Sequence, residues 1–383
     1  MRTIRTIETW IGAGCLSLAA LASAQAQETV FMPNVVELSG AGAVSGTNWR
    51  DGATLAIEEI NAKGGILGRK IVTSVSDTQS NPGVSRAQVQ RALDGKPYVI
   101  LGPIFSGSVK VCMSLAQQAE IPQLTGGEAA ELTQAGNPYL FRTSFGQQFA
   151  MPKIANYLAD GLKAKTAAIV WVNNDFGKGG RDGFLKAAAA RGIKVVADIS
   201  TESGQVDFAA DVVKIKSAKP DAIFIYTNEE ESARLLREAR KQSVTAPIVG
   251  DTNLLSQKVV ELAGAAANGV RGHIGLSAEV PIPAVQEFRA KFLKRFNYVP
   301  DHNGIKGYTA VYAVKYATQK QGKFDSKLLA RTMHGLTITP KDEPGILIDT
   351  SWDDQGDIDR ISWLGEIVDG KQKIVQTLPK LGK

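Results

Sequence analysis

The sequence is poor in cysteine, which limits how the protein can be stabilised. Cys15 and Cys112 are the only two cysteines among 383 residues, and Cys15 lies in an N-terminal segment that we expect to be removed. A chain left with one thiol forms no internal disulfide, so its stability must come from burial of an apolar core. Removal of 26 residues would leave 357, a length typical of about two domains.

Beyond its N-terminus the sequence has no apolar run long enough to cross a membrane. Two arginines precede an apolar stretch over Trp10–Ala22, which is shorter than the roughly 20 residues that a membrane span needs. Ala24-Gln-Ala26 has the small-x-small pattern that signal peptidase cleaves. We therefore predict a signal peptide cleaved after Ala26 and an exported, periplasmic, soluble protein. Lipidation of Cys15 is disfavoured, because Gly12 stands where a lipoprotein signal needs a bulky aliphatic residue.

The sequence also lacks concentrated charge of one sign. Its formal net charge is +6, and the predicted signal peptide contributes +1 of this, which leaves +5 spread over the mature chain. No run of four consecutive basic residues occurs, and no helix pair typical of DNA binding is evident. These features argue against nucleic acid as a partner.

Motifs for catalysis, cofactors and metals are missing or incomplete. Gly40-Ala-Gly42 follows a predicted strand, but Ser45 stands where a dinucleotide-binding fingerprint requires its third glycine. No G-x-S-x-G nucleophile elbow is present. The three histidines have no metal-ligand spacing, and we expect surface or capping positions for His273, His302 and His334. We therefore predict no cofactor, no metal and no enzymatic activity.

What the sequence does contain is a long alternation of helix and strand patterns. Apolar residues between Ala53 and Ile60 share one helical face, Gly64 and Gly65 can close that helix, and 71–75 favours a strand. Further strands are predicted at 98–101, 121–124, 166–172, 193–199, 221–226 and 248–250, and further helices at 109–119, 208–217, 284–296 and 304–319. Asp369-Gly370 is predicted to turn a hairpin between 361–368 and 372–377. This alternation is typical of doubly wound α/β lobes.

Two loops in the first half of the chain carry candidate ligand-binding residues. Ser106 and Ser108 lie where a strand is followed by a helix, and a helix N-terminus favours an anionic ligand group such as a carboxylate. Alternatively, both serines only cap that helix. Gly126, Gly127 and Glu128 follow the next predicted strand, and Glu128 could instead be a simple acid at a helix start.

The second half repeats this arrangement. Phe176 lies in a glycine-rich turn after a strand, where it can face a ligand or pack in the core. Asp251 follows another strand and could accept from a ligand ammonium, or serve as an ordinary turn residue. The segment 229–241 places acids at one end of a helix and bases at the other, so we predict a solvated helix there, or less favourably a partner-docking face.

With these residues in view, the chain resembles the periplasmic leucine/isoleucine/valine-binding protein family, the type I solute-binding proteins of ABC transporters. The likeness covers nearly the whole mature chain and is carried, in order, by 58–69, 102–106, 129–133 with 141–143, 174–177 and 352–356. The resemblance implies an α/β fold of two doubly wound lobes joined by a three-crossing hinge, closing on a solute like a Venus flytrap. It implies a first lobe of 27–145 plus about 275–345, and a second lobe of 146–274 plus about 346–383.

The resemblance also implies roles for particular positions. The family's carboxylate-binding serine is similar to Ser106, its backbone-donating turn to Gly126 and Gly127, its second-lobe aromatic to Phe176, and its ammonium-binding acid to Asp251 or Thr252. Three positions depart from the family pattern, namely Glu128 in place of a hydroxyl residue, Asn228 in place of a cleft aromatic, and Ser45 in place of a tyrosine. Trp49 and Phe176 could frame an aromatic acid or an amide.

The function that the resemblance implies is capture of a small polar solute for delivery to an ABC permease. An amino acid of the branched-chain type or a related carboxylate is the expected solute, and aromatic acids, amides or urea are alternatives. A ligand sensor subunit of the same fold is a further alternative, and an exported oxidoreductase is disfavoured by the incomplete glycine fingerprint. The expected partners are the solute and the permease subunits, with the binding protein itself a monomer.

Overall fold

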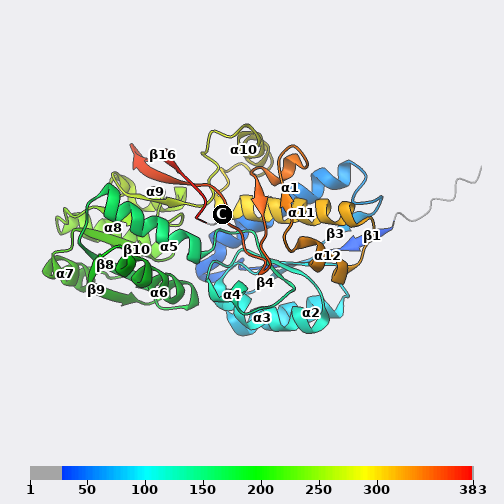
Figure 1. Cartoon of the computed structure of the whole chain (residues 1–383), viewed down its shortest axis with the longest axis horizontal. Helices are drawn as coiled ribbons and strands as arrows, with labels where there is room; N and C mark the ends of the chain where they lie inside the picture. Colours follow the sequence, from blue (N-terminus) through cyan, green and yellow to red (C-terminus); the bar gives the residue numbers. More distant parts are fainter. Residues whose placement is uncertain (1–27, 382–383) are drawn as a thin grey trace, which may run out of the picture.

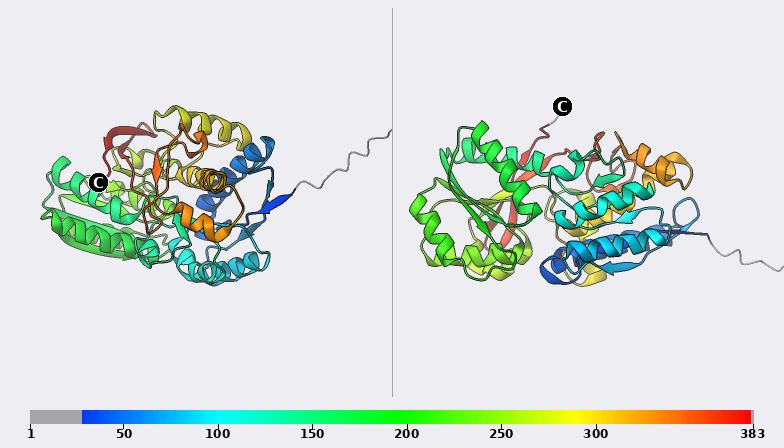
Figure 2. Two further views of the ribbon diagram at one scale, coloured as in Figure 1. Left: turned by 45° about the vertical axis from the view of Figure 1, so that its right-hand side comes forward. Right: turned by 90° about the horizontal axis from the view of Figure 1, so that it is seen from below.

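The computed structural model describes residues 28–381. The predicted signal peptide, its cleavage after Ala26 and the cysteine at position 15 lie outside these residues. None of the helices in residues 28–381 has both the length and the apolar character needed for a membrane span. The described chain forms two lobes that lie side by side along the longest axis (Figures 1 and 2), which confirms the predicted α/β fold of two lobes.

The first lobe is built on a five-stranded parallel sheet with strand order β4-β2-β5-β6-β7. β1 and β3 pair in parallel beside it, and β13 and β14 form a short antiparallel pair. Its strands are β1 (Thr29–Phe31), β2 (Asn34–Val36), β3 (Lys70–Val72), β4 (Val75–Asp77), β5 (Ile100–Leu101), β6 (Gln123–Thr125), β7 (Leu140–Arg142), β13 (Thr337–Ile338) and β14 (Thr350–Ser351). Its helices are α1 (Ala43–Ala62), α2 (Pro82–Asp94), α3 (Ser106–Ala119), α4 (Glu131–Gln134), α10 (Pro283–Phe296), α11 (His302–Gln321) and α12 (Ser326–Met333).

The second lobe is built on a seven-stranded sheet with strand order β16-β15-β12-β11-β10-β8-β9. The strands from β12 to β9 are parallel, whereas β15 and β16 run antiparallel to their neighbours. Its strands are β8 (Thr166–Val172), β9 (Lys194–Thr201), β10 (Ala222–Tyr226), β11 (Ile248–Gly250), β12 (Arg271–Ile274), β15 (Ser362–Val368) and β16 (Lys371–Leu378). Its helices are α5 (Gln147–Asn156), α6 (Asp175–Ala190), α7 (Ala209–Ala218), α8 (Glu229–Lys241) and α9 (Gln257–Ala263).

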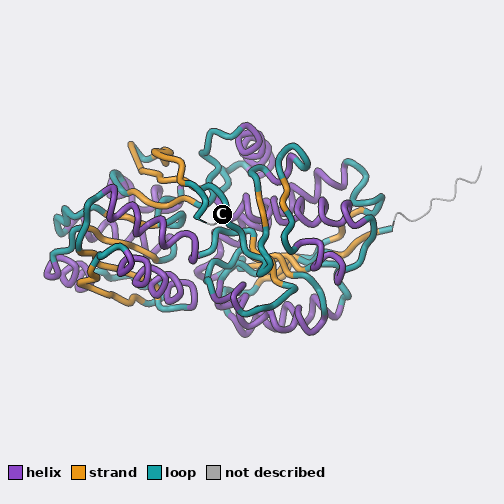
Figure 3. Tube along the Cα trace, viewed as in Figure 1, coloured by secondary structure: helices purple, strands orange, loops and turns teal. Residues whose placement is uncertain are grey.

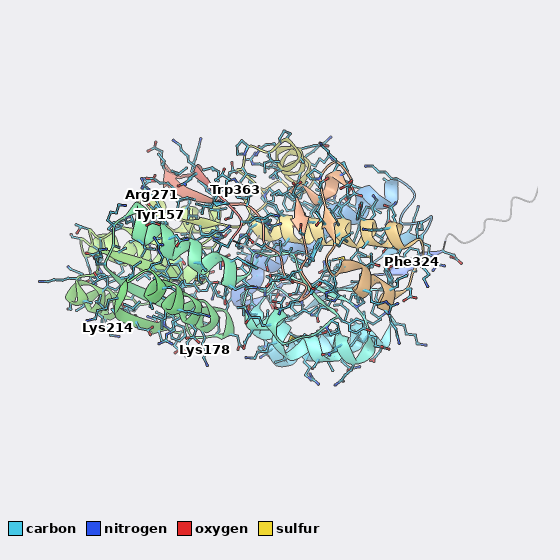
Figure 4. The ribbon with its side chains drawn as sticks, in the orientation of Figure 1. Tyr157, Lys178, Lys214, Arg271, Phe324 and Trp363 are labelled. Carbon is cyan, nitrogen blue, oxygen red and sulfur yellow. The ribbon has the colours of Figure 1, made fainter. Side chains whose placement is uncertain are left out.

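Helices cover both faces of each sheet (Figure 3), and the strand residues alternate between the two helical layers. In β10, Phe224 and Tyr226 join the apolar cluster under α5 and α6, whereas Ile223 and Ile225 join the cluster under α7, α8 and α9. A strand buried on both faces must be apolar at every position, which is why the run at 222–226 has no polar residue inside it. Arg271 of β12 donates to the Tyr157 hydroxyl at 3.1 Å, and Figure 4 shows both residues at the upper side of this lobe.

The chain passes between the two sheets three times. It leaves the first sheet after β7, returns after β12 to form α10 and α11, and crosses again between β14 and β15. The third passage, over 352–361, lies beyond the expected boundary at about 345/346, because β14 still pairs with β13, which follows α12 of the first lobe.

Most predicted elements are confirmed, including β8 with the predicted bounds and the hairpin turned by Asp369-Gly370 between β15 and β16. Gly64 and Gly65 have φ values of 95° and 82° and end α1 as expected. The strand predicted at 71–75 is wrong as one unit, because the chain leaves β3 after Val72 and begins β4 at Val75. The two strands pair with different neighbours, β1 and β2.

Candidate functional site

A cavity of about 220 Å³ lies between the lobes at the carboxyl ends of their strands, where ligands bind in open α/β sheets. Its first-lobe wall consists of Ala41, Ser45, Ser80, Pro82, Ile104, Phe105, Ser106, Gly107, Ser108, Gly126, Glu128, His302, Asn303 and Lys306. Its second-lobe wall consists of Asn174, Asp175, Phe176, Ser203, Asn228 and Asn253. Most of these side chains are polar, so the cavity suits a polar solute.

Ser106 begins α3 and links two loops of the first lobe. Its hydroxyl oxygen accepts from the backbone N–H groups of Glu128 at 3.3 Å and Ala129 at 3.2 Å. Since both lone pairs of the oxygen are occupied, its hydrogen remains available to donate into the cavity. No side chain caps α3, so the alternative that both serines are caps is wrong. The Ser108 hydroxyl bonds instead to Ser85 at 2.9 Å.

A buried acid that the sequence analysis did not single out lies behind the start of α3. The carboxylate of Glu37 accepts from the backbone N–H groups of Ile104 at 3.1 Å and Phe105 at 3.2 Å. Burial raises the pKa of Glu37, and hydrogen bonds from these N–H groups and Ser108 lower it in part. This carboxylate therefore already occupies part of the anion-binding capacity of the helix start.

The loop after β6 contributes Gly126 and Glu128 to the cavity but turns Gly127 away from it. The carbonyl of Gly127 accepts from the Arg142 guanidinium and from the Ser144 hydroxyl, both at 2.8 Å. Arg142 also forms an ion pair with Asp357 at 3.0 Å, in which both side chains are almost completely buried. The loop is thus held from behind by a charge pair that joins β7 to the third passage between the lobes.

Glu128 is neither a helix-start acid nor an isolated negative charge. Helix α4 begins three residues later, at Glu131. The Glu128 carboxylate lies 2.7 Å from the ammonium of Lys306, which also donates to the Asn303 amide oxygen at 3.2 Å. The ion pair is nearly buried, with the Lys306 and Glu128 side chains 3% and 12% exposed. This pairing explains how an acid is tolerated at this position.

The start of α11 forms one side of the cavity because α11 packs very closely on α1. A side chain at Gly52 would lie 2.0 Å from the backbone oxygen of Gly304, so the two helices touch through their backbones. This contact carries His302, Asn303 and Lys306 into the cavity wall, although no local motif marks them.

The prediction that His273 and His302 are surface or capping residues is wrong, because both are buried. His334 is half-buried, and its Nε2 bonds to the Pro138 carbonyl at 2.9 Å.

The second lobe offers an aromatic surface. The Phe176 ring stacks on Tyr226 with the ring centroids 4.3 Å apart and the planes inclined by 22°. Gln147 donates to the Phe176 carbonyl at 2.8 Å and to the Tyr226 hydroxyl at 2.9 Å, which fixes both residues. Phe176 therefore packs in the protein and lines the cavity at once, combining the two predicted roles.

The first turn of α8 faces the first lobe. Asn228 lines the cavity, and the buried Glu229 accepts from the hydroxyl of Ser45 in α1 at 3.4 Å. Glu231 is buried as well and accepts from the backbone N–H of Gly204. The prediction of a solvated helix is therefore wrong for the N-terminal acids, although Glu230 is exposed and pairs with Arg234.

Three predicted site residues lie next to the cavity rather than on its surface. Asp251 is 4% exposed and accepts from the Asn253 backbone N–H at 3.2 Å, while Asn253 itself lines the cavity. The Thr252 hydroxyl accepts from the Gly275 backbone N–H. Trp49 lies in the core behind Gly126, where its indole donates to the Asn34 side chain at 3.1 Å. The structure therefore does not bring Trp49 together with Phe176.

The surroundings of the cavity are rich in buried carboxyl groups. Burial, then repulsion from Glu128, raises the pKa of Asp251 well above its usual range. Burial likewise raises the pKa of Glu229 to about 7 and that of Asp301 to about 6. Lys306 is the one lysine or arginine that lines the cavity in the described part of the chain, and burial together with its charge lowers the pKa of His302 well below the usual range. A cation beside these carboxyl groups would favour their ionised form, whereas an anion would raise their pKa values further.

A larger groove of about 630 Å³ lies outside the strand ends, between α3 and α4 of one lobe and α5 and α6 of the other. At its edge, the Lys110 ammonium lies 3.0 Å from Asp175 in the second lobe and 2.8 Å from Glu131 in the first. The contact between Lys110 and Asp175 ties the lobes together beside the cavity.

Within residues 28–381, no group of three or more His, Cys, Asp or Glu side chains is arranged to hold a metal ion.

Comparison with known proteins relates this architecture to one family. A family model described as periplasmic binding protein matches residues 29–372. The Leu/Ile/Val-binding protein BraC3 of Rhizobium johnstonii is 31% identical over 267 residues, which cover 69% of this chain and 72% of that protein.

Two solved structures are similar over more than nine-tenths of this chain. The branched-chain amino acid transporter substrate binding protein LivJ of Streptococcus pneumoniae, in complex with isoleucine, is 25% identical with a TM-score of 0.83, and the match covers 92% of this chain and 100% of that one. A solute binding protein of R. palustris in complex with benzoate is 20% identical with a TM-score of 0.84, covering 93% and 98% of the two chains. At 20% identity, the second likeness concerns the fold alone.

Proposed function

Because the chain belongs to the periplasmic binding protein family, we propose that it is the solute-binding subunit of an ABC transporter and captures an amino acid between its lobes for delivery to the permease. The cavity of about 220 Å³ between the strand ends is the observation that carries this proposal. Its lining comes from both lobes, so a bound solute stabilises the closed arrangement. To shift the equilibrium between open and closed lobes from 1:99 to 99:1, a ligand must bind the closed state about 10⁴-fold more tightly than the open state. Such a difference in affinity requires contacts from both lobes.

The chemistry of the walls suits the two charged groups of an amino acid. The Ser106 hydroxyl and the start of α3 can donate to a carboxylate, and the acidic side at Glu128 and Asp251 can accept from an ammonium. The Phe176 ring offers an apolar face to the rest of the solute. The ligand of the related LivJ structure is itself an amino acid, isoleucine.

The relatives are solute-binding proteins, and we propose that this chain likewise has no enzymatic activity. We further propose an exported monomer that is cleaved after Ala26 and acts with ABC permease subunits. Its first lobe would comprise 27–145 plus about 275–351, and its second lobe would comprise 146–274 plus the chain after about 361.

A ligand screen tests the proposal directly. Native mass spectrometry of the freshly purified protein would detect a co-purified solute, and a thermal-shift screen would compare the amino acids with aromatic acids, amides and urea. A solute present at 100 times its Kd stabilises the folded protein by about 2.7 kcal/mol, so at least one amino acid should raise the melting temperature. Stabilisation only by aromatic acids, amides or urea would contradict the amino-acid assignment.

Two substitutions test the proposed site with the solute that the screen identifies. Ser106→Ala removes a hydrogen bond to the ligand carboxylate, and Asp251→Ala removes the carboxyl group beside the cavity that we propose to receive the ammonium. A hydrogen bond to a charged group is worth about 1.5–3 kcal/mol, so affinity should fall roughly 10- to 150-fold by calorimetry in each variant. Ser114→Ala provides the control, because Ser114 is exposed on the same helix as Ser106. Wild-type affinity in both site variants would show that the solute binds elsewhere.

A further inference from the structure

Glu229 forms a second acidic position directly beside the cavity, apart from the carboxylate proposed to receive the α-ammonium. It is the first residue of α8, 6% exposed, and its hydroxyl partner Ser45 lines the cavity from the opposite lobe. The contact between them is a long hydrogen bond of 3.4 Å. A buried carboxylate usually needs an opposite charge or several hydrogen bonds. Glu229 has no ion-pair partner among residues 28–381, and its carboxyl group accepts only from Ser45 and from its own backbone N–H.

Carboxyl groups outnumber positively charged side chains around the cavity. Glu128, Glu229, Asp251 and Asp301 are all buried or nearly buried there, and of these only Glu128 has an ion-pair partner in the described chain. Asp301 is engaged as the N-cap of α11, where it accepts from the backbone N–H groups of Asn303 and Gly304. A neutral amino acid brings one positive and one negative group, so it provides no additional cation for the carboxyl groups of Glu229 and Asp251, whose pKa burial raises and which a nearby cation would keep ionised.

His302 supplies an independent observation, because it follows Asp301, whose charge acts on Glu229 from the first lobe. Its side chain is 4% exposed and lines the cavity, yet its ring makes no hydrogen bond to any other described residue. Burial and the charge of Lys306 lower the pKa of His302 and so favour the neutral ring, in which one nitrogen is an acceptor. An acceptor that lines the cavity and has no partner in the described residues can receive an N–H group from the solute.

We propose that the solute is a cationic amino acid, whose second positively charged nitrogen is held between Glu229 of the second lobe and the His302 side of the first. This inference rests on the proposed function and narrows its substrate class. Such a solute contacts Glu229 only when the lobes are together, so its side chain stabilises closure as well as binding. Neutral aliphatic amino acids would leave Glu229 without a cation, and an anionic aromatic acid would add to the negative charge.

Matched pairs of ligands separate charge from shape. L-arginine and L-citrulline have similar shapes and differ in side-chain charge, and L-lysine and L-norleucine differ by the terminal ammonium. We expect L-arginine or L-lysine to bind at least tenfold more tightly than its neutral counterpart and than L-leucine, measured by isothermal titration calorimetry. Equal or tighter binding of the neutral member of both pairs, or of L-leucine, would overturn the inference and leave the proposed amino-acid function standing. Binding of no amino acid would overturn both.

Glu229→Gln tests the residue itself. The variant should lose at least tenfold in affinity for the preferred cationic amino acid, while the affinity for its neutral counterpart changes less than threefold. Glu230→Gln is the matched control, because Glu230 is the exposed neighbour that pairs with Arg234, and it should bind like the wild type. An unchanged preference for the cation in Glu229→Gln would refute the assignment of Glu229. Because the ligand comparison uses the wild-type protein, it decides the question even if the variant folds poorly.

Discussion

Asp357→Asn should destabilise the protein strongly although the side chain keeps its size. Asp357 is 1% exposed and forms an ion pair with Arg142, which is completely buried. The Thr133 hydroxyl also donates to Asp357 at 2.8 Å, and the Gln148 amide donates to the same oxygen. Replacement of the carboxylate leaves the permanently charged guanidinium buried without its counter-ion, because arginine cannot release its proton in a protein.

The size of the effect follows from this burial. Removing one partner of a buried ion pair costs about 3–5 kcal/mol. For domains of 150–250 residues each kcal/mol lowers the melting temperature by about 2–4 °C, so we expect a decrease of roughly 6–20 °C. Arg142 also donates to the carbonyl groups of Gly127 and Ala129, so the loop that shapes the cavity should loosen together with the hinge.

Scanning calorimetry and urea denaturation followed by circular dichroism would measure this change in the ligand-free protein. Asp354→Asn is the control, because Asp354 is exposed in the same loop and surface substitutions usually change stability by less than about 0.5 kcal/mol. If the two variants had the same melting temperature, the buried pair would contribute no net stability and the reasoning would be refuted.

Two further predictions concern the contacts between the lobes. Lys110→Met removes an exposed ion pair to the second lobe that is worth at most about 1 kcal/mol. The amino acid that binds most tightly in the screen should therefore bind up to about fivefold more weakly at low salt. The loss of affinity should be smaller at high salt, because salt screens exposed charges. Glu131→Gln removes only the contact of Lys110 within the first lobe, and an equal loss of affinity in this control would contradict the interpretation. The second prediction concerns the free energy of unfolding of the ligand-free protein. Burial raises the pKa of Glu229 from 4.5 to about 7, so the folded protein binds this proton more tightly than the unfolded chain. As the pH rises from about 4.5 to 7, the wild type should therefore lose about 3 kcal/mol of its free energy of unfolding relative to Glu229→Gln. Urea midpoints of both proteins across this range would measure the difference, and parallel pH profiles would exclude it.

The elements of the fold follow closely from local sequence patterns. The strand at 166–172 is apolar at nearly every position because it is buried on both faces, and Asn81-Pro82 starts α2 where the Asn81 side chain accepts from the Val84 backbone N–H. Such signals act within a few residues, so they are visible without the tertiary structure. The split between β3 and β4 was not visible, because it depends on which neighbours the two strands find.

The candidate site was predicted only in part. Ser106, Gly126, Glu128, Phe176 and Asn228 follow strand ends, and the structure places all of them on the cavity. The burial of Glu229 was only weakly indicated by its position shortly after the end of β10. Its acidic neighbours and the basic residues along the helix instead form a pattern typical of an exposed helix. Lys306 and His302 had no local signal, because they come from a helix whose sequence is more than 170 residues away from Glu128.

Periodicity and turn residues thus specify the α/β lobes of this protein and the ends of its strands, since hydrophobic burial and backbone conformation act on neighbouring positions. The charge of the binding cavity depends instead on how distant segments meet. The backbone contact between α1 and α11 brings Lys306 to Glu128, and the approach of the lobes brings Glu229 to Ser45. Electrostatic interactions depend on distance in space and on exclusion of water, and neither can be read from positions along the chain.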